Sequence, residues 1–383
     1  MLRTGSPDGL WIECHGHVLN DNCRALGYDR TGRQSMWRWQ GGMLSLLLGV
    51  SIAGILSVAA EPRVMSKQST TRPTGLVYHP DFLLHDPGPD HPERPARLQA
   101  MMAHLKRRGL LDTLLVLDAE PASEQWITRV HTPAYLRQLQ SAVRHAPTAL
   151  DADTRVSKQS YDVARRAVGG VLAAVDAVMA GRTTNAFAAL RPPGHHALAD
   201  RAMGFCLLNH VAIATRYVQE QHGVERVLIV DWDVHHGNAT QEAFYRDPSV
   251  LFFSTHQYPY YPGTGAAHEV GEGAGHGTTI NVPLAARSGD AAMVKAFRER
   301  LLPAAAAFRP QFVLISAGFD AHQSDPLAQL QVTEAGYATL TRIVKTIADQ
   351  HAEGRLVSVL EGGYHLDGLA RSVEAHLRVL AGH

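Results

Sequence analysis

The stretch Val227-Leu-Ile-Val-Asp231-Trp-Asp233-Val-His235-His236-Gly237-Asn238 decides how this chain is organised. Four apolar β-formers lead to a polar tip, and the run breaks at a glycine. Side chains along a strand alternate between its two faces, so Asp231, Asp233 and His235 are expected on one side. Two buried carboxylates beside an imidazole repel and desolvate one another unless a cation lies among them. The stretch therefore predicts a buried strand that ends in a divalent-metal site, with zinc as the first candidate.

Strands and helices alternate on both sides of this stretch. The expected strands are residues 75–79, 185–190, 227–234, 250–254, 279–282, 312–317 and 356–360. The expected helices are residues 96–108, 133–143, 161–179, 208–221, 238–245, 290–308, 333–349 and 366–380. This alternation predicts an α/β fold: a single three-layer α/β/α domain with a mainly parallel sheet covered on both faces.

The composition is that of an ordinary soluble domain, with 383 residues, 45% of them hydrophobic and 19% charged. The 36 basic and 36 acidic residues balance, so nothing in the total charge favours a nucleic acid or a membrane surface as partner. The three cysteines, Cys14, Cys23 and Cys206, form neither a disulfide framework nor a CxxC metal site. A reducing cytoplasm fits this usage.

The first 70 residues differ from the rest and are treated as a leader before a catalytic domain at 71–383. Residues 43–60 form an uncharged apolar run. It is near the lower limit of about 17–25 residues for a membrane-spanning helix. Read from Met36, it also resembles a signal peptide with a small-residue cleavage site at 58–60. Translation could instead begin later, for instance at Met65. All three interpretations remain open, and a membrane partner is expected only if the leader is real.

Polar side chains follow four of the expected strands where each one ends. Besides the opening stretch, these ends carry Arg191-Pro-Pro-Gly-His195-His196, Gly318-Phe-Asp320-Ala-His322-Gln-Ser-Asp325-Pro326 and Glu361-Gly-Gly-Tyr364-His365. In open α/β sheets, ligands bind beyond the carboxyl ends of the strands. The four ends are therefore expected to converge on one site.

A metal held by Asp233 and His235 needs a further protein ligand. Asp325 is the natural candidate, because it lies in a short Ser-Asp-Pro turn after another buried strand. Asp320 is the competitor, although its place directly after Gly-Phe suits a structural turn residue equally well. Three protein ligands and one open position are typical of a catalytic zinc rather than a structural one.

The remaining polar groups suit a hydrolytic site. His195 and His196 could act as general base and proton relay, or be one packed and one exposed imidazole. Tyr364 follows two glycines and could donate to a developing oxyanion, or merely belong to a turn. The aromatic residues in 258–261 and in Gly204-Phe-Cys206 could wall an apolar channel or plug the core.

From about residue 75 to its end, the chain resembles the histone deacetylase family, zinc amidohydrolases of the arginase-like α/β fold, and is most similar to the class II-like branch. The matching motifs are His91-Pro-Glu-Arg-Pro95, Arg191-Pro-Pro-Gly-His-His196, Gly204-Phe-Cys206, Asp231-Trp-Asp-Val-His-His-Gly-Asn238, Pro262-Gly-Thr-Gly265, Ser316-Ala-Gly-Phe-Asp320, Asp325-Pro326 and Glu361-Gly-Gly-Tyr364. Each motif alone is modest evidence, but all of them in order are highly specific.

The resemblance implies a role for each site residue. The zinc ligands would be Asp233, His235 and Asp325. The catalytic groups would be the tandem pair His195 and His196, the phenol of Tyr364, Asp231 behind His195, and Asn238, which stands where class I relatives have an acid. The acyl-lysine channel would be lined by Gly204, Phe205 and Tyr261. A monovalent-cation site, for K⁺, would comprise Asp231, Asp233, His235 and Ser254. His236 is left without a catalytic role and is interpreted as structural.

The function implied is zinc-dependent removal of acetyl groups from the Nε of lysine in proteins or peptides, releasing acetate. The alternatives are an acetylpolyamine amidohydrolase and a catalytically silent acyl-lysine binding module. Leu327 stands where one polyamine-deacetylating branch has an acid, which favours acyl-lysine, although the acid-rich loop 81–90 could supply such a group. Expected partners are an acetylated protein, peptide or small amine, with no direct nucleic-acid contact and with oligomerisation left open.

Overall fold

The structure is a computed structural model that describes residues 27–28, 34–35 and 72–383. The chain divides into a unit spanning Met1–Lys67 and a unit spanning Gln68–His383. In the first, β1 (Gly27–Tyr28) pairs antiparallel with β2 (Gln34–Ser35). The apolar run 43–60 lies outside the described residues, so its three interpretations remain expectations. Among the helices that the structure describes, none is long and apolar enough to cross a membrane.

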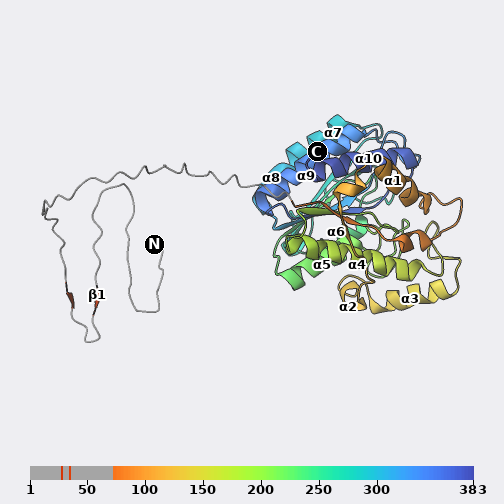
Figure 1. Cartoon of the computed structure of the whole chain (residues 1–383), viewed down its shortest axis with the longest axis horizontal. Coiled ribbons are helices and arrows are strands. Elements are labelled where there is room, and N and C mark those ends of the chain that lie inside the picture. The colour runs from red at the N-terminus through yellow and green to blue at the C-terminus, as the bar shows by residue number, and fades with distance from the viewer. Residues whose placement is uncertain (1–26, 29–33, 36–71) are drawn as a thin grey trace, which may run out of the picture. The chain divides into compact units, whose positions relative to one another are not determined.

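An eight-stranded sheet forms the centre of the second unit (Figure 1). Its strands are β3 (Gly75–Val77), β4 (Leu115–Leu117), β7 (Asn185–Ala188), β8 (Val227–Asp231), β9 (Val250–Gln257), β10 (Thr279–Leu284), β11 (Phe312–Ala317) and β12 (Leu356–Leu360). They lie in the order β10-β9-β8-β11-β12-β7-β3-β4, and every neighbouring pair is parallel. A separate two-stranded ribbon pairs β5 (Thr148–Ala149) with β6 (Arg155–Val156). The predicted mainly parallel sheet is confirmed.

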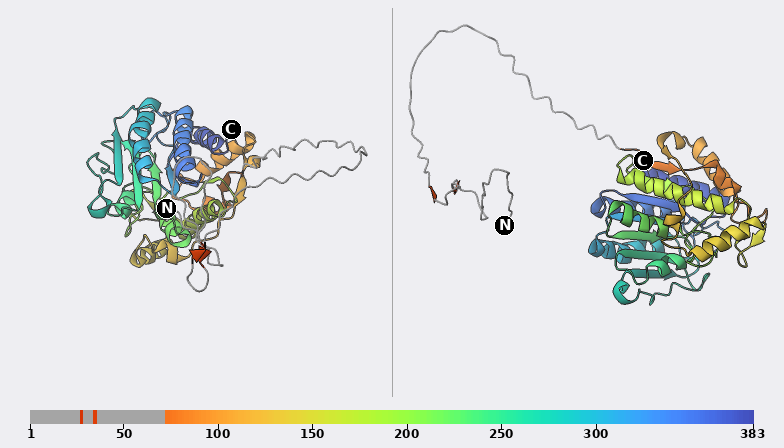
Figure 2. Two further views of the ribbon diagram at one scale, coloured as in Figure 1. Left: turned by 90° about the vertical axis from the view of Figure 1, so that its left-hand side faces the viewer. Right: turned by 90° about the horizontal axis from the view of Figure 1, so that it is seen from below.

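Helices cover both faces of this sheet (Figures 1 and 2). One layer contains α1 (Ala96–Arg107), α7 (Asp290–Ala296), α8 (Leu302–Phe308), α9 (Glu334–His351) and α10 (Leu366–Leu380). The other contains α2 (Glu124–Ile127), α3 (Pro133–Arg144), α4 (Ser160–Met179), α5 (His210–His222) and α6 (Asn238–Phe244). The three-layer α/β/α architecture expected from the sequence is therefore the one observed.

The central strands are apolar because both of their faces are buried. All residues of β8, β11 and β12 are inaccessible to solvent or nearly so. Such strands read as continuous runs of Val, Ile and Leu rather than as alternating patterns. Small residues let α4 approach the sheet closely: a Cβ on Gly170 would lie 2.5 Å from Cγ1 of Val77 in β3. Packing of this kind fixes the strand ends that carry the polar side chains.

Three of the departures from the expected elements are informative. Strand β8 ends at Asp231, so strand alternation does not govern Asp233 or His235, which lie in the following loop. The edge strand β4 was not predicted, because it is three residues long and its Leu115 and Val116 are exposed. The helix expected at 290–308 contains a π-helical turn, Phe297–Leu301, just before Pro303, whose ring nitrogen cannot donate to the helix.

The four polar strand ends do converge. β8, β11, β12 and β7 are consecutive in the sheet and parallel, so their carboxyl ends share one edge. The register aligns Asp231 with Ser316 on one side and with Ser254 on the other. The loops that follow these four strands form the site described below.

Candidate active site

Three ionisable side chains meet at the edge of the sheet beyond β8 and β11. Asp233 and His235 follow β8, and Asp320 follows β11; their potential ligand atoms all lie within 4.8 Å of one another. Nδ1 of His235 is 3.1 Å from Oδ1 of Asp233 and 3.2 Å from Oδ2 of Asp320. All three residues are buried. The residues that the opening stretch predicted as metal ligands thus do come together, with a third partner from the neighbouring strand.

Asp325, the acid expected to complete a metal site with Asp233 and His235, is buried, and its carboxylate accepts backbone hydrogen bonds. Its assignment as a metal ligand stays a prediction. Oδ2 of Asp325 accepts hydrogen bonds from the backbone N–H groups of Tyr364, at 2.6 Å, and His365, at 3.2 Å. Its Oδ1 accepts from the N–H of Leu327 at 3.1 Å. Asp320 and Asp325 both follow β11, and Asp320 is the one that contacts Nδ1 of His235.

The cluster has the properties of a cation site. Oδ2 of Asp320 is buried without a hydrogen bond among the described residues. Burial, and then the negative charge of Asp233, raise the pKa of Asp320 to about 7. Gly362 closes this side, since its N–H donates to Oδ2 of Asp233 at 2.9 Å and a Cβ there would lie 2.1 Å from Oδ2 of Asp320. Two carboxylates and an imidazole with unsatisfied oxygen fit a zinc-like divalent ion.

His195 is held in a strongly acidic environment. Its Nδ1 lies 2.9 Å from Oδ2 of Asp231, as expected, and its Nε2 lies 3.8 Å from Oδ1 of Asp233. Burial alone would lower the pKa of His195, but Asp231 and then Asp233 outweigh it and raise the value to about 10. Asp231 therefore points at the histidine, away from the three-residue cluster.

The environment of His196, in contrast, favours the neutral ring. Its Nδ1 lies 2.7 Å from the side-chain oxygen of Asn238, which can only accept a hydrogen bond. The proton of a neutral His196 is therefore on Nδ1, and Nε2 keeps a lone pair. Burial, and then the positive charge on His195, hold the pKa of His196 well below its usual range. The tandem pair thus combines a neutral acceptor with a protonated neighbour 4.0 Å away between ring centroids.

A narrow cavity of about 150 Å³ opens onto these groups. Its lining residues are Asp153, Pro193, His195, His196, Gly204, Phe205, His235, Tyr260, Tyr261, Leu327, Gly362 and Tyr364. The expected channel residues Gly204, Phe205 and Tyr261 all belong to it. The ring of Tyr261 is edge-on to His196 with centroids 5.2 Å apart. Gly204 has φ +54°, and a Cβ there would lie 2.4 Å from Cδ2 of His196, so only glycine fits.

Tyr364 lines the same cavity as the histidine pair. Its ring is edge-on to Phe205, with centroids 5.8 Å apart, and the guanidinium of Arg97 lies 4.9 Å from its centroid. Burial raises the pKa of the phenol well above its usual range, so it stays protonated at neutral pH. A protonated phenol is a hydrogen-bond donor suited to a developing oxyanion.

Two functional residues were not identified from the sequence. Glu361 accepts hydrogen bonds from the N–H groups of Gly194, at 2.6 Å, and His195, at 3.2 Å, and so fixes the loop that carries the tandem histidines. The sequence feature that could have identified Glu361 is its position directly after β12. Asp153 puts a carboxylate at the cavity wall. It lies between β5 and β6, outside the polar ends of the strands in the eight-stranded sheet, and nothing in the sequence pattern marked it.

The structure also places the residues expected around a monovalent cation. Asp231 and Ser254 are direct partners in the β8–β9 register, while Asp233 and His235 follow on the same loop. Oγ of Ser254 lies 2.9 Å from Nδ1 of His256. His236 has both ring nitrogens engaged, with Oγ1 of Thr264 at 2.8 Å and Oε1 of Gln241 at 3.0 Å, as a structural residue would.

Comparisons with known proteins agree with this geometry. The profile of the histone deacetylase domain matches residues 91–380. A probable deacetylase of Archaeoglobus fulgidus is 43% identical over 297 residues, covering 77% of this chain and 82% of that protein. A histone deacetylase-like amidohydrolase of Pseudomonas aeruginosa is 42% identical, with 72% of each chain covered. The polyamine deacetylase HDAC10 of Homo sapiens is 42% identical over 81% of this chain and 48% of that protein.

A solved structure is similar as well. The crystal structure of the HDA15 HD domain superposes with a TM-score of 0.78 at 40% identity, covering 82% of this chain and 90% of that one. The residues matched by the domain profile, 91–380, include every strand end of the site. The chain therefore belongs to the histone deacetylase family and is a hydrolase acting on amide bonds.

Proposed function

We propose that this protein is a zinc-dependent amidohydrolase that removes acetyl groups from the Nε of lysine in proteins or peptides and releases acetate. One observation carries the proposal: His196 and Tyr364 both line a narrow cavity that reaches His235 of the Asp233–His235–Asp320 cluster. A proton acceptor, an oxyanion donor and a cation site around one cavity are what hydrolysis of an amide requires.

Asp233, His235 and Asp325 would hold the zinc, as the resemblance implies, with Asp320 as the alternative third ligand. When bound, zinc acts as a Lewis acid and lowers the pKa of a coordinated water toward about 7. We also propose a K⁺ ion beside it, near Asp231 and Ser254. An ion there would lie under the loop that carries Asp233 and His235 and would help to fix it.

The side chains of this protein have separate roles in the reaction. Nε2 of His196 accepts the proton of the attacking water, while Asn238 holds the opposite ring nitrogen. His195, charged and paired with Asp231, orients and polarises this acceptor. The phenol of Tyr364 donates a hydrogen bond to the tetrahedral oxyanion. Protonated His196 then gives its proton to the leaving amine, so that the products are acetate and a free amine.

The cavity favours an extended acyl-amine chain. The aromatic rings of Phe205 and Tyr261 wall it, and apolar Leu327 lies in its lining. A lysine side chain presents four methylenes between such walls, and no carboxylate follows the Asp-Pro turn at 325–326 to read a distal ammonium. The second candidate substrate is an acetylpolyamine, favoured by the carboxylate of Asp153 in the same lining.

The two substrate classes are separated by kcat/KM for an acetyl-lysine peptide and for acetylspermidine, measured with zinc-loaded protein. The proposal expects a clear preference for the peptide, loss of turnover after chelation, and loss in His196→Ala. A higher kcat/KM for acetylspermidine would favour the second candidate. Binding of acetyl-lysine with full zinc but without turnover would instead indicate a silent binding module.

A further inference from the structure

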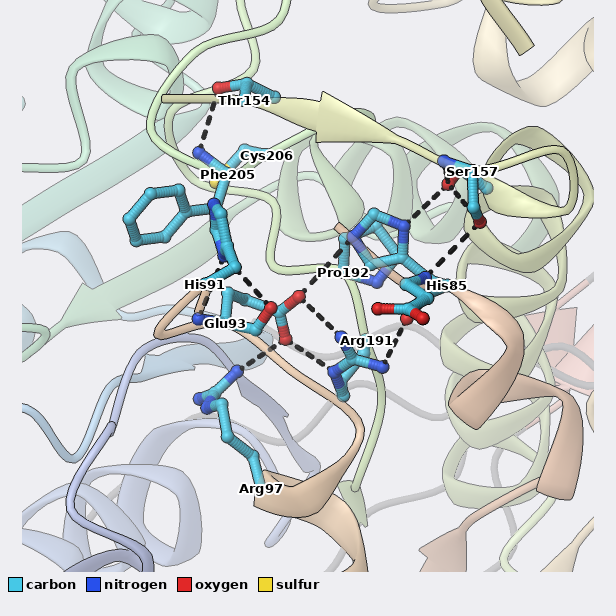
Figure 3. A network of polar contacts seen from close by, with 12 residues as sticks. His85, His91, Glu93, Arg97, Thr154, Ser157, Arg191, Pro192, Phe205 and Cys206 are labelled. Atoms are coloured by element: carbon cyan, nitrogen blue, oxygen red, sulfur yellow. Dashed lines mark hydrogen bonds and ion pairs between the residues drawn. The ribbon is translucent and has the colours of Figure 1, made fainter. Parts of the chain in front are cut away.

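The motif His91-Pro-Glu-Arg-Pro95 has no part in the reaction described above, yet its Glu93 is completely buried. Figure 3 shows the carboxylate of Glu93 between the guanidinium groups of Arg191 and Arg97, with His85 on the remaining side. Oε1 lies 2.5 Å from Nε of Arg191 and 3.0 Å from Nη1 of Arg97. Oε2 lies 2.7 Å from Nη2 of Arg191 and 3.4 Å from Nε2 of His85.

This carboxylate is ionised and firmly held. Burial alone would raise the pKa of Glu93, but Arg191, His85 and Arg97 together hold it well below its usual range. Arg191 grips it with two parallel N–H···O bonds, and its Nη1 donates to the carbonyl oxygens of Phe82 and His85, both at 2.9 Å. Bidentate guanidinium–carboxylate pairs fix orientation as well as distance. Glu93 is therefore a rigid point next to Arg97.

Arg97 connects the fixed carboxylate of Glu93 to the turn that presents Tyr364. Its Nε donates to the carbonyl oxygen of Gly363 at 2.6 Å, and its Nη2 donates to that of Glu361 at 2.5 Å. These carbonyls lie in the turn that presents Tyr364. The same guanidinium lies 4.9 Å from the centroid of the Tyr364 ring. The remaining nitrogen of the guanidinium, Nη1, donates to the carboxylate of Glu93. Glu93 therefore fixes the orientation in which Arg97 binds the turn.

Tyr364 needs such external support. The turn contains two glycines, and Gly363 has φ +125°, a conformation that constrains little by itself. The phenol must also face groups on a different strand end, because Tyr364 follows β12 and His196 follows β7. A displacement of about 1 Å in such an arrangement can cost a hundredfold in rate.

We propose that Glu93 is a positioning residue for the deacetylation reaction, acting through Arg97 to hold the phenol of Tyr364 against the oxyanion. This inference rests on the proposed function. It assigns a task in the reaction to the His91–Pro95 motif. It also predicts that the consequence of losing Glu93 depends on whether the Tyr364 hydroxyl is present.

The test is a double-mutant cycle on the zinc-loaded full chain with an acetyl-lysine peptide. Glu93→Gln keeps the volume and one acceptor but removes the charge that Arg97 faces. We expect kcat to fall about 10- to 100-fold, with a much smaller change in KM, because a misplaced donor mainly affects the transition state. In a Tyr364→Phe background, Glu93→Gln should cause little further loss, because residues that act as one unit are not additive.

A matched control is Glu374→Gln. Glu374 is also a carboxylate with several basic partners: Nε2 of His104 at 2.6 Å, Nε of Arg108 at 2.9 Å and Nη2 of Arg378 at 2.7 Å. It belongs to α10, where that helix packs on α1. This variant should change stability without changing kcat. Glu93→Asp, which keeps the charge, should recover part of the lost rate. If Glu93→Gln fails to fold, Arg97→Lys serves in the same cycle, since it keeps the charge but loses the fork that binds both carbonyls.

The inference is overturned if Glu93→Gln lowers kcat by the same factor with and without the Tyr364 hydroxyl. It is also overturned if Glu93→Gln changes kcat no more than Glu374→Gln does, because Glu93 would then only stabilise the fold. If the unmodified protein does not hydrolyse the acetyl-lysine peptide, the proposed function fails first, and the two failures are therefore distinguishable.

Discussion

Nδ1 of His235 lies 3.2 Å from Oδ2 of Asp320, and this contact joins the loops that follow the adjacent strands β8 and β11. The same nitrogen lies 3.1 Å from Asp233. Parallel neighbours bring their carboxyl ends to one edge, so residues far apart in sequence can share a cation. Asp325, in contrast, binds the backbone of the turn that carries Tyr364.

Substitution of the two candidate acids should therefore have different effects on metal content. Asp325→Asn should lower zinc affinity at least about tenfold, in the range seen when groups around a metal are removed. Asp320→Asn should keep its zinc. Bound zinc per chain, measured after dialysis against a competing chelator, distinguishes them. Zinc loss in Asp320→Asn alone would assign the third ligand position to Asp320 instead.

Metal removal should lower stability as well as activity. Buried Asp233 and Asp320 repel each other without a cation, and a ligand bound at 100 times its Kd stabilises a fold by about 2.7 kcal/mol. We expect a lower Tm after chelation and recovery with Zn²⁺ but not with Mg²⁺, which prefers oxygen ligands in octahedral geometry. An unchanged Tm together with full activity after verified zinc removal would contradict a metal-dependent site.

The sequence was sufficient for the central strands of the sheet because the hydrophobic pattern and the burial of both faces agreed there. Apolar runs at β8, β11 and β12 are long enough to read as buried strands, and polar residues mark their ends. The choice between Asp320 and Asp325 cannot be made from the sequence pattern alone. Both follow the same strand, and only the path of the loop decides which carboxylate reaches His235. The sequence did not reveal the partners of Glu93 either, because Arg191 lies 98 positions away in the chain.

Removal of the phenol should be a nearly pure transition-state effect. Tyr364→Phe keeps the ring that packs on Phe205 but loses the only hydroxyl assigned to the oxyanion. We expect kcat to fall by about 10²–10³, as when one oxyanion-hole donor is removed, with KM almost unchanged. Steady-state kinetics with an acetyl-lysine peptide measure both parameters. A large rise in KM with kcat preserved would place the tyrosine in ground-state binding instead.

Substrate preference should respond to a carboxylate at Leu327. Leu327→Glu puts a negative charge in the cavity lining, where it can pair with the distal ammonium of acetylspermidine. We expect the ratio of kcat/KM for acetylspermidine to that for the peptide to rise at least about tenfold at low salt, and less at high salt because ions screen exposed pairs. Leu327→Gln is the matched neutral control. An equal shift in both variants would mean that polarity, rather than charge, selects the substrate.

The buried histidine His131 should make stability fall in mild acid. Its Nδ1 lies 2.8 Å from the carbonyl oxygen of Leu198, and the N–H of Asn209 donates to its Nε2 at 2.9 Å. The ring must therefore be neutral, and burial lowers its pKa to about 4. Between that value and the unfolded pKa of about 6.5, the unfolded chain binds more protons than the folded one, so stability rises with pH.

Through His131 alone, the free energy of unfolding should fall by about 2 kcal/mol from pH 7 to pH 5, because each pKa unit corresponds to about 1.36 kcal/mol. His131→Gln can keep one donor and one acceptor but cannot titrate. Urea unfolding of both proteins at the two pH values measures the effect, and other titrating groups cancel in the comparison. We expect the pH-dependent loss of stability to be about 2 kcal/mol smaller in the variant. Equal losses in the two proteins would mean that protonated His131 is accommodated in the fold, in conflict with its two backbone partners.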